Sequence, residues 1–504
     1  MNEDSTVMEP KTLTPRQRMQ IPRQPMPEQK PEVRRHNFDE VPLGYDAETA
    51  ITEANRCIMC KVPHCIDGCP VFIDIPAFVD LVTRGEFARA AQKIKETNIL
   101  PAICGRVCPQ ENQCELQCVL SKKYKPVAIG RLERFVADYE REHNLVVDPV
   151  VPPPTGCKIA VVGSGPAGLT AASEMARRGH QVVIYEALHQ AGGVLFYGIP
   201  RFRLPAGVIN SELEYLKKMG VEIQVNKVIG KLATPEELME EMGFDAIFLG
   251  TGAGLPRFPR VPGENLNGVY SANEYLTRLN LMGAYTFPEA ITPVFCGKRV
   301  AVFGAGNTAM DAARTSIRLG PENVTIYYRR TREEAPARVE EIEHAMQEGV
   351  HFEWLTAPLE FYGDDNYFVK RARLQRMKLG DPDESGRRRP EPIPGSEFGV
   401  DVDTAIFALG FGVNPLIKEA TPDLETDRRG VVKASAETGM TSIDGVFAGG
   451  DVMTGGATVI LAMGQAKIAA RGMHNWLIDK KGLNLPKEKP PEPVSRAKRK
   501  SKKT

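Results

Sequence analysis

The chain has 504 residues, of which 42% are hydrophobic and 25% are charged, and its formal net charge is zero. This length predicts two to four domains, because a single hydrophobic core does not grow to serve so many residues. The balanced charge argues against a nucleic-acid-binding surface spread over the whole molecule. The sequence has no apolar run of about 18 residues and no apolar signal core at its start, so we expect a cytoplasmic protein that does not enter a membrane.

The first part of the chain changes character twice. Residues 1–40 are rich in Pro, Gln and charge and show no helical or strand period, which predicts an extended N-terminal arm. A helical domain is expected over residues 41–150, because stretches such as 75–96 place apolar residues three and four apart. The proline-rich stretch 149–156 then indicates a stiff linker and a domain boundary.

From Lys158 onward, short β-branched strands alternate with helices, which is typical of α/β domains. The chain ends in a stretch rich in Pro, Lys and Arg, and residues 481–504 are expected to form a disordered basic tail. A docking segment for acidic partners or nucleic acid is the alternative for this tail.

Eight of the ten cysteines lie between positions 57 and 118, in two groups: Cys57, Cys60, Cys65 and Cys69, then Cys104, Cys108, Cys114 and Cys118. In a reducing compartment this density favours metal or cluster ligation over disulfides. A structural zinc site typically uses two C-x2-C pairs, and only one occurs here. Prolines follow Cys69 and Cys108, as they follow cluster ligands in ferredoxins. The spacing therefore favours iron–sulfur clusters over zinc.

A glycine-rich turn follows the apolar strand IAVV and opens a helix. Gly163 permits the tight turn, Gly165 lets the backbone approach a pyrophosphate, and Gly168 lets helix and strand pack closely. The helix N-terminus, with Pro166 and Ala167, offers N–H donors to phosphates. Glu186 ends the next strand, where a carboxylate can accept hydrogen bonds from ribose hydroxyls. These features predict a dinucleotide site.

A second strand–turn–helix unit repeats the design. Gly304 and Gly306 follow the strand RVAVF, the helix opens with Asn307 and Thr308, and Ala309 replaces the third glycine. The next strand ends in Arg329 and Arg330 instead of an acid, with Arg332 close by. Arginines suit a 2′-phosphate, so NADP(H) is favoured over NAD(H). A solvated basic turn is the alternative.

Three stretches carry a family resemblance: CIMCKVPHCIDGCPVFIDIPAF, ICGRVCPQENQCELQCV and PVAIGRLERFVADYE. They resemble the N-terminal helical domain of the glutamate synthase small subunit. The same domain occurs in dihydropyrimidine dehydrogenase and in the large subunit of electron-bifurcating NADH-dependent ferredoxin–NADP oxidoreductase. The resemblance covers about residues 35–480.

The resemblance implies two [4Fe–4S] clusters with interleaved ligands. The first cluster would use Cys57, Cys60, Cys65 and Cys118. The second cluster would use Cys69, Cys108, Cys114 and a non-cysteine ligand, which here is Glu133. Cys104 is then left as a small buried residue. For Glu133, a surface ion pair with Arg134 or Arg131 is the alternative.

The resemblance also implies FAD in the first dinucleotide site. Gly193 in AGGVLFYGIPRFRLP would approach the cofactor, and Gly450 and Asp451 belong to the second flavin signature, with Asp451 on the ribitol chain. We expect an α/β protein with an N-terminal ferredoxin-like helical domain and two Rossmann-like domains of the glutathione-reductase type. The expected boundaries are 156–285 and 400–480 for the FAD domain, with an NADPH domain inserted at 286–399.

Two nucleotide sites and two clusters imply a relay in which NADPH gives hydride to FAD, and FAD gives single electrons to the clusters. Hydride transfer needs no acid or base, so no catalytic side chain is nominated. Cys157 and Cys296 are solitary, which excludes a disulfide reductase. The leading hypothesis is a glutamate synthase small-subunit-type NADPH oxidoreductase. Its partner would be the large subunit, which forms glutamate from glutamine and 2-oxoglutarate.

Two other hypotheses remain. The first is the bifurcating transhydrogenase subunit, whose partner would be a ferredoxin-reductase-like flavoprotein. The second is an assembly scaffold with degenerate sites, although the intact glycines, acids and cysteines argue against it. Either redox role implies a hetero- or homo-oligomer.

Overall fold

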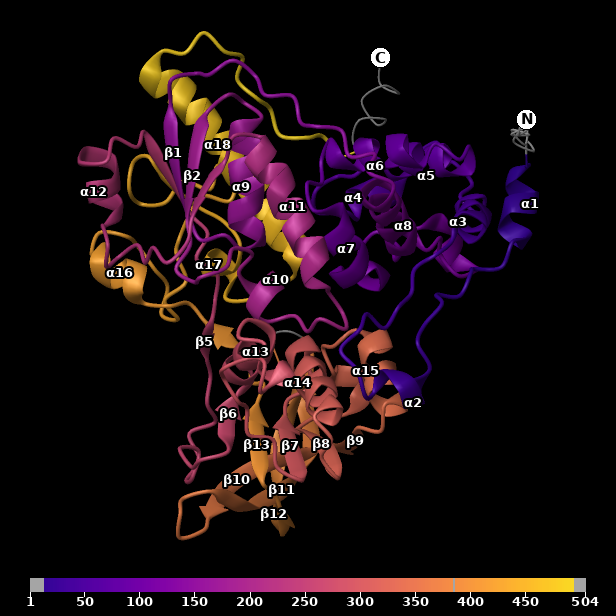
Figure 1. Cartoon of the computed structure of the whole chain (residues 1–504), viewed down its shortest axis with the longest axis vertical. Helices are drawn as coiled ribbons and strands as arrows, with labels where there is room; N and C mark the ends of the chain where they lie inside the picture. Colours follow the sequence, from indigo (N-terminus) through magenta and orange to yellow (C-terminus); the bar gives the residue numbers. More distant parts are fainter. Residues whose placement is uncertain (1–12, 384–385, 494–504) are drawn as a thin grey trace.

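The computed structural model describes residues 13–383 and 386–493. Figure 1 shows a helical domain beside a first α/β domain, with a second α/β domain below both. Helices α9, α11 and α18 lie between the first sheet and the helical domain. Among the described residues, no helix has the length and apolar content needed to cross a membrane.

The N-terminal region is helical throughout. Two short helices lie in the arm, and the helical domain packs six helices and two 3-10 turns around an apolar core that includes Phe78, Ile94 and Leu132. The elements are α1 (Pro15–Gln20), α2 (Pro31–Arg34), α3 (Ala47–Ala54), α4 (His64–Asp67), α5 (Ile75–Thr83), α6 (Phe87–Lys95), α7 (Pro101–Val107), η1 (Gln110–Asn112), η2 (Val119–Lys122) and α8 (Ile129–Glu142).

The first α/β domain has a parallel five-stranded sheet in the order β15-β4-β1-β2-β3. Its strands are β1 (Lys158–Val162), β2 (Gln181–Tyr185), β3 (Glu222–Gln224), β4 (Ala246–Leu249) and β15 (Val446–Ala448). Its helices are α9 (Pro166–Ala176), α10 (Val194–Tyr197), α11 (Ala206–Lys218), α12 (Pro235–Glu240), α16 (Leu416–Ala420), α17 (Asp451–Thr454) and α18 (Val459–Lys481).

The second α/β domain has a parallel sheet in the order β6-β13-β7-β8-β9 and a separate antiparallel sheet, β10-β11-β12. The parallel strands are β6 (Val269–Ser271), β7 (Arg299–Phe303), β8 (Asn323–Tyr328), β9 (His351–Trp354) and β13 (Thr404–Phe407). The antiparallel strands are β10 (Thr356–Gly363), β11 (Val369–Pro382) and β12 (Arg388–Asp401). The helices are α13 (Ala272–Asn280), η3 (Ala284–Thr286), α14 (Asn307–Arg318), η4 (Arg332–Glu334) and α15 (Val339–Gln347).

The boundary between the two α/β domains differs from the expected one. Residues 156–285 and 400–480 were expected in the first domain, yet β6 and β13 pair with each other and β13 pairs with β7 in the second sheet. The β6 strand is only three residues long, and β13 has the same apolar character as the strands of the first sheet. The local sequence pattern therefore does not show to which of the two sheets either strand belongs. The connection between the domains is the short ribbon of β5 (Leu255–Pro256) and β14 (Phe411–Gly412).

The arm is more ordered than its composition predicts. Helix α1 begins with a capping box between Thr14 and Gln17, and Pro31 opens α2. The arm is held by tertiary contacts, which local composition does not reveal. At the other end, Glu488 pairs with Arg178, so part of the expected tail packs on the first domain. The remainder of that expected tail, residues 494–504, lies outside the described residues, as do residues 1–12 of the arm.

Buried ion pairs join the domains. Arg203 of the first α/β domain pairs with Asp311 of α14 at 2.7 Å and with Glu341 of α15 at 2.9 Å. Arg338 reaches from the second α/β domain to Glu111 of the helical domain at 2.9 Å. Since removing one partner leaves an uncompensated buried charge, these pairs fix how the three domains sit against one another.

Candidate functional site

Four cysteines that are distant in sequence converge in the helical domain. Cys57 follows α3, Cys60 precedes α4, Cys65 lies in α4, and Cys118 is the cap of η2. All four line one cavity, whose other walls are mostly apolar and include Ile58, Pro63, Ile75, Val79 and Ile129. We call them the first cysteine group, and the residues are those that the family resemblance implied for one cluster.

Burial, together with the neighbouring thiols of the same group, raises the pKa of the Cys57 thiol to about 11 and that of the Cys65 thiol to about 12. Converging thiols without a nearby cation are unfavourable as thiolates. A bound iron ion supplies the missing positive charge and deprotonates its ligands. The donor set and its apolar walls therefore fit an iron–sulfur cluster.

The second cysteine group consists of Cys69, Cys108 and Cys114, all of which are buried. A hydrogen bond with Cys104, together with burial, raises the pKa of Cys108, and the charges of Glu133 and Cys69 raise it further. Burial raises the pKa of Cys114, and Cys69 and Glu133 are again among the neighbours that raise it. The three thiols and Glu133 therefore share one electrostatic environment.

Glu133 lies on α8 and is 5% exposed. Burial raises its pKa to about 8, although a hydrogen bond from the Asn98 side chain at 2.7 Å acts to lower it. Arg134 pairs instead with Glu40 and Asp138, and Arg131 pairs with Glu340. The alternative of a surface ion pair for Glu133 is therefore wrong, and the carboxylate fits a position beside the second cysteine group.

Cys104 is fully buried on α7. Its Sγ atom lies 3.6 Å from the Met463 Sδ atom of α18 and 3.8 Å from the Asn98 Oδ1 atom. The expectation of a small buried residue agrees with this packing. The contact also shows that α18, which begins at Val459, packs against the residue four positions before Cys108.

A glycine of α18, Gly464, packs closely against the residue that follows Cys69. A Cβ atom on Gly464 would lie 2.8 Å from the carbonyl oxygen of Pro70, the residue that follows Cys69. Only glycine allows this approach without a shift. The first turns of α18 therefore pack against Cys104 and Pro70, which flank the second cysteine group in the sequence.

The first glycine loop has the geometry of a dinucleotide site. Gly163 has a φ of +99°, and a Cβ atom on Gly168 would lie 1.9 Å from the Gly163 carbonyl oxygen. By contrast, a Cβ atom on Gly165 would meet no atom within 4 Å, which leaves space at the N-terminus of α9, where Pro166 and Ala167 follow. This open, N–H-lined position fits a pyrophosphate.

Glu186 is held at the end of β2. Its carboxylate accepts hydrogen bonds from the backbone N–H groups of Ser164 at 2.9 Å and Leu188 at 2.8 Å. The Ser164 hydroxyl also donates to Glu186 and accepts from the Gly192 N–H group at 2.8 Å. Gly193 packs against the glycine loop, since its Cβ atom would lie 2.8 Å from the Gly165 Cα atom. One network thus joins the acid, the loop and the predicted flavin segment.

Asp451 opens α17 at the same end of the sheet. Its Oδ1 atom accepts a hydrogen bond from the Ala457 N–H group at 2.9 Å, and burial raises its pKa. A Cβ atom on Gly450 would lie 2.7 Å from the Ala167 Cβ atom, so this segment abuts α9. The structure therefore brings both predicted flavin segments together, with the capped start of α18 beside them.

Tyr197 was not predicted from the sequence. Burial, followed by the charges of Asp451 and Glu186, raises the pKa of its phenol to about 12. Tyr197 thus lies near both acids of the flavin site. Its position at the end of α10, in the segment that contains Gly193, was the signal that could have identified it.

The second glycine loop has similar geometry. Gly304 has a φ of +132°, and its Cβ atom would lie 2.4 Å from the Ala408 carbonyl oxygen. Gly306 caps α14 and is open, with its nearest neighbour at 3.9 Å. Asn307 and Thr308 form the first turn of α14, and the Asn307 Oδ1 atom accepts a hydrogen bond from the Arg338 N–H group at 3.0 Å. This loop also fits a pyrophosphate.

The two arginines after β8 have different surroundings. Arg329 is exposed, whereas Arg330 is buried. The Arg330 guanidinium donates to the Arg388 carbonyl oxygen at 2.7 Å and pairs with Asp383 at 2.8 Å. Arg330, which was predicted to bind the 2′-phosphate, therefore has its guanidinium engaged by Asp383 directly after β11 and Arg388 at the start of β12. These partners come from an antiparallel sheet that the sequence did not reveal. Arg329 is exposed directly after β8.

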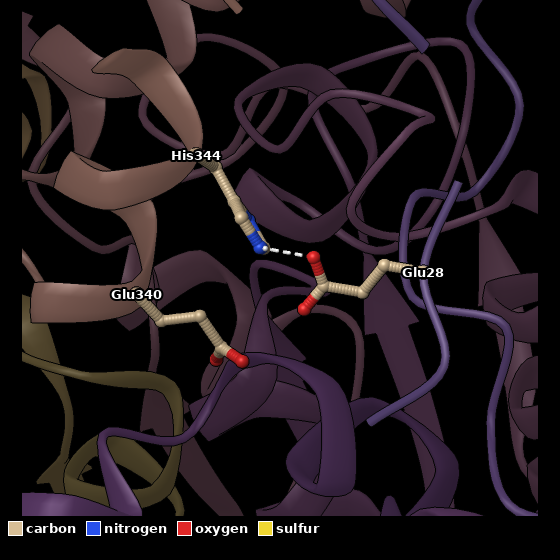
Figure 2. A group of neighbouring side chains, drawn as sticks. All are labelled: Glu28, Glu340 and His344. Atoms are coloured by element: carbon tan, nitrogen blue, oxygen red, sulfur yellow. Dashed lines mark hydrogen bonds and ion pairs between the residues drawn. The ribbon is translucent and has the colours of Figure 1, made fainter. Parts of the chain in front are cut away.

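A third group of possible ligands, Glu28, Glu340 and His344, lies where the arm meets α15 (Figure 2). The His344 Nε2 atom is 3.0 Å from Glu28, which also pairs with Arg34 at 3.0 Å. Glu340 pairs with Arg338 at 3.3 Å. Because arginines already balance both carboxylates, we interpret this group as the contact that holds the arm on the second α/β domain.

Two family models match the chain. The first, described as dihydropyrimidine dehydrogenase domain II, 4Fe-4S cluster, matches residues 34–145. The second, described as pyridine nucleotide-disulphide oxidoreductase, matches residues 157–466. The cysteine groups lie within the first match, and both glycine loops lie within the second.

The chain is also similar to curated relatives over most of its length. The chain is 37% identical to the glutamate synthase [NADPH] small chain of Azospirillum brasilense, over 90% of this chain and 94% of the relative. It is 38% identical to the NADPH-Fe(3+) oxidoreductase subunit beta of Geobacter sulfurreducens, over 82% of this chain and 63% of the relative. Among solved structures, FprA of Mycobacterium tuberculosis in complex with NADPH has a TM-score of 0.53 at 21% identity. That match covers 69% of this chain and 89% of FprA, and it shows the reductase fold.

Proposed function

The chain belongs to the family of the glutamate synthase small chains, and from this premise we propose that it carries electrons from NADPH to a partner that forms glutamate from glutamine and 2-oxoglutarate. The chain is an NADPH oxidoreductase with FAD and [4Fe–4S] iron–sulfur domains. The finer parts of the proposal are the number of clusters, which we take as two, and the identity of the partner.

One observation carries the relay. The helix that begins at the flavin site, α18, packs through Met463 and Gly464 against Cys104 and Pro70, the sequence neighbours of the second cysteine group. Cys65 of the first group is one of the charges that raise the pKa of Cys114 in the second group. These contacts support an order in which electrons pass from the flavin site to the second group and then to the first group.

The protein's contribution is to hold these sites in place and to keep water out. FAD supplies the conversion between two-electron hydride transfer and one-electron steps, and the clusters carry single electrons. The first glycine loop and Glu186 would hold the FAD pyrophosphate and ribose, and Asp451 would accept a hydrogen bond from the ribitol chain. The buried pairs of Arg203 with Asp311 and Glu341 keep the two nucleotide domains in register.

For the nucleotide, Arg329 is the side chain that we propose for the 2′-phosphate. Arg329 is exposed at the surface. Partial burial of its guanidinium lowers its pKa, and the positive charges of Arg330 and Arg387 also lower it. Because Arg330 is already paired with Asp383, Arg329 is the arginine of this turn that we propose to bind the dianion.

The test is reconstitution. We would co-express the full chain with a glutamate synthase large chain, purify the complex without oxygen, and measure glutamate formed from glutamine and 2-oxoglutarate with NADPH as the reductant. We expect glutamate formation that requires both chains. Full reduction of flavin and clusters by NADPH without any glutamate would contradict the proposed partner and leave the oxidoreductase intact.

A further inference from the structure

The first cysteine group lies beside an unusual surface segment. Residues 116–125, which we call the lysine segment, include Cys118 and the turn η2. Gln117, Val119 and Leu120 of this segment line the same cavity as the four cysteines. The lysine segment is therefore part of the wall that separates the first group from solvent.

Three apolar side chains of the lysine segment are exposed. Leu116 is 55% exposed, Val119 is 38% exposed and Tyr124 is 42% exposed. Single exposed apolar residues are common on protein surfaces, but a group of them beside a functional site is typical of a protein-binding surface.

The charge of the lysine segment is one-sided. Lys122, Lys123 and Lys125 are exposed, and no acidic residue occurs between Glu115 and Glu133. Glu115 is buried and pairs with Arg23. Within residues 13–383 and 386–493, these three lysines form no ion pair.

Two lysines of α11 differ in this respect. Lys217 pairs with Glu214 at 2.7 Å, and Lys218 pairs with Asp148 at 2.5 Å. Because no acidic side chain in the described parts of the chain balances their charge, the lysines beside the exposed apolar residues can attract a negatively charged protein surface.

We propose that the lysine segment is the docking surface for the redox partner, and that this partner presents carboxylates around an apolar contact. The inference rests on the proposed function, because it takes the first cysteine group as the end of the relay. Charge complementarity raises the rate of encounter and orients the partner, while the exposed apolar side chains supply contact at the centre of the interface.

The test uses the full holoprotein and a plant-type [2Fe–2S] ferredoxin of strongly negative net charge as the probe. The variant K122E/K123E reverses the charge of the lysine segment, and K217E/K218E changes the net charge equally at a distant helix. Titration calorimetry would give the dissociation constant at about 20 mM and about 200 mM salt.

We expect the parent chain and K217E/K218E to bind the probe with affinities within about twofold, and K122E/K123E to bind at least about tenfold more weakly, with a smaller salt dependence. The variant L116S should also weaken binding while keeping the salt dependence, because it removes only apolar contact.

Equal affinity of K122E/K123E and K217E/K218E would overturn the proposal, as would no binding of the probe by the parent chain. Tighter binding of the parent chain to phosphatidylserine vesicles than to ferredoxin would also overturn it, in favour of a membrane surface. Iron content and NADPH-dependent ferricyanide reduction are measured on the same samples. Their loss in the parent chain would refute the proposed function, whereas their retention with unchanged binding refutes only the docking surface.

Discussion

The two cysteine groups occupy one helical domain but have opposite surroundings. All four cysteines of the first group are partly exposed, whereas the three cysteines of the second group are buried and have Glu133 as a neighbour. Cys104 and Pro70, which flank the second group in the sequence, contact α18, the helix that begins at the flavin site. The contrast teaches that the fold separates a buried group from a partly exposed one, although the sequence interleaves their cysteines. In the proposed relay, the buried group is the inner site and the partly exposed group is the outer site.

The largest expected effect comes from breaking the inner site. In Cys108→Ser, we expect iron to fall from about eight to about four atoms per chain. NADPH should still reduce the flavin, but it should no longer reduce the surviving outer cluster. Iron analysis and electron paramagnetic resonance after NADPH addition check this. Rapid reduction of the outer cluster in this variant would show that the inner site is not on the route.

The matched change in the outer site is Cys60→Ser. Iron should again fall by about half, but NADPH should still reduce the inner cluster, because the contact with α18 is unchanged. Delivery to a protein acceptor should stop. Electron paramagnetic resonance after NADPH addition measures the reduction of the inner cluster. Identical spectra of Cys60→Ser and Cys108→Ser would contradict the proposed order of the two clusters.

A change at the electron-entry end should leave both cysteine groups alone. In Arg329→Ala, we expect the KM for NADPH to rise about tenfold or more, since a charge-assisted bond to the 2′-phosphate is lost. The KM for NADH should not change. Steady-state ferricyanide reduction measures both values. An equal rise for NADH would point to structural damage instead of phosphate recognition.

The smallest effect sharpens the inner site. In Glu133→Gln, we expect the reduction potential of one cluster to rise by roughly 60 mV, a tenfold change in a one-electron equilibrium, because a negative ligand is replaced by a neutral one. Equal potentials in the variant and the parent chain would mean that Glu133 is not a ligand.

The pH dependence of the same potential gives a second test. Without iron, Glu133 has a pKa of about 8. A free carboxyl would therefore be protonated at pH 7 and would ionise as the pH rises through 8. The potential would then fall by up to about 59 mV per pH unit. A carboxylate bound to iron stays ionised, so we expect a flat potential across this range.

Much of this site could be predicted, because the chemistry depends on local spacing. The glycine loops with Glu186 and the clustered cysteines are short-range patterns, and the structure brings both sets together. Arg330 shows the limit of such patterns. Its partner Asp383 lies 53 positions away, in an antiparallel sheet that local pattern did not reveal.

Tertiary contacts explain the other differences. Tyr197 becomes a neighbour of Asp451 only when α10 meets α17, and Met463 meets Cys104 across 359 positions. The arm, which by composition should be extended, is ordered because Arg34 is buried and pairs with Glu348 at 3.0 Å. Such long-range pairings carry no local sequence signal.

The most direct measurement is an anaerobic reductive titration of the purified chain with dithionite, followed by absorbance and electron paramagnetic resonance. We predict an uptake of about four electrons per chain, two by the flavin and one by each of two clusters with distinct spectra. An uptake of about two electrons, with bleaching of flavin alone and no cluster signal, would contradict the account.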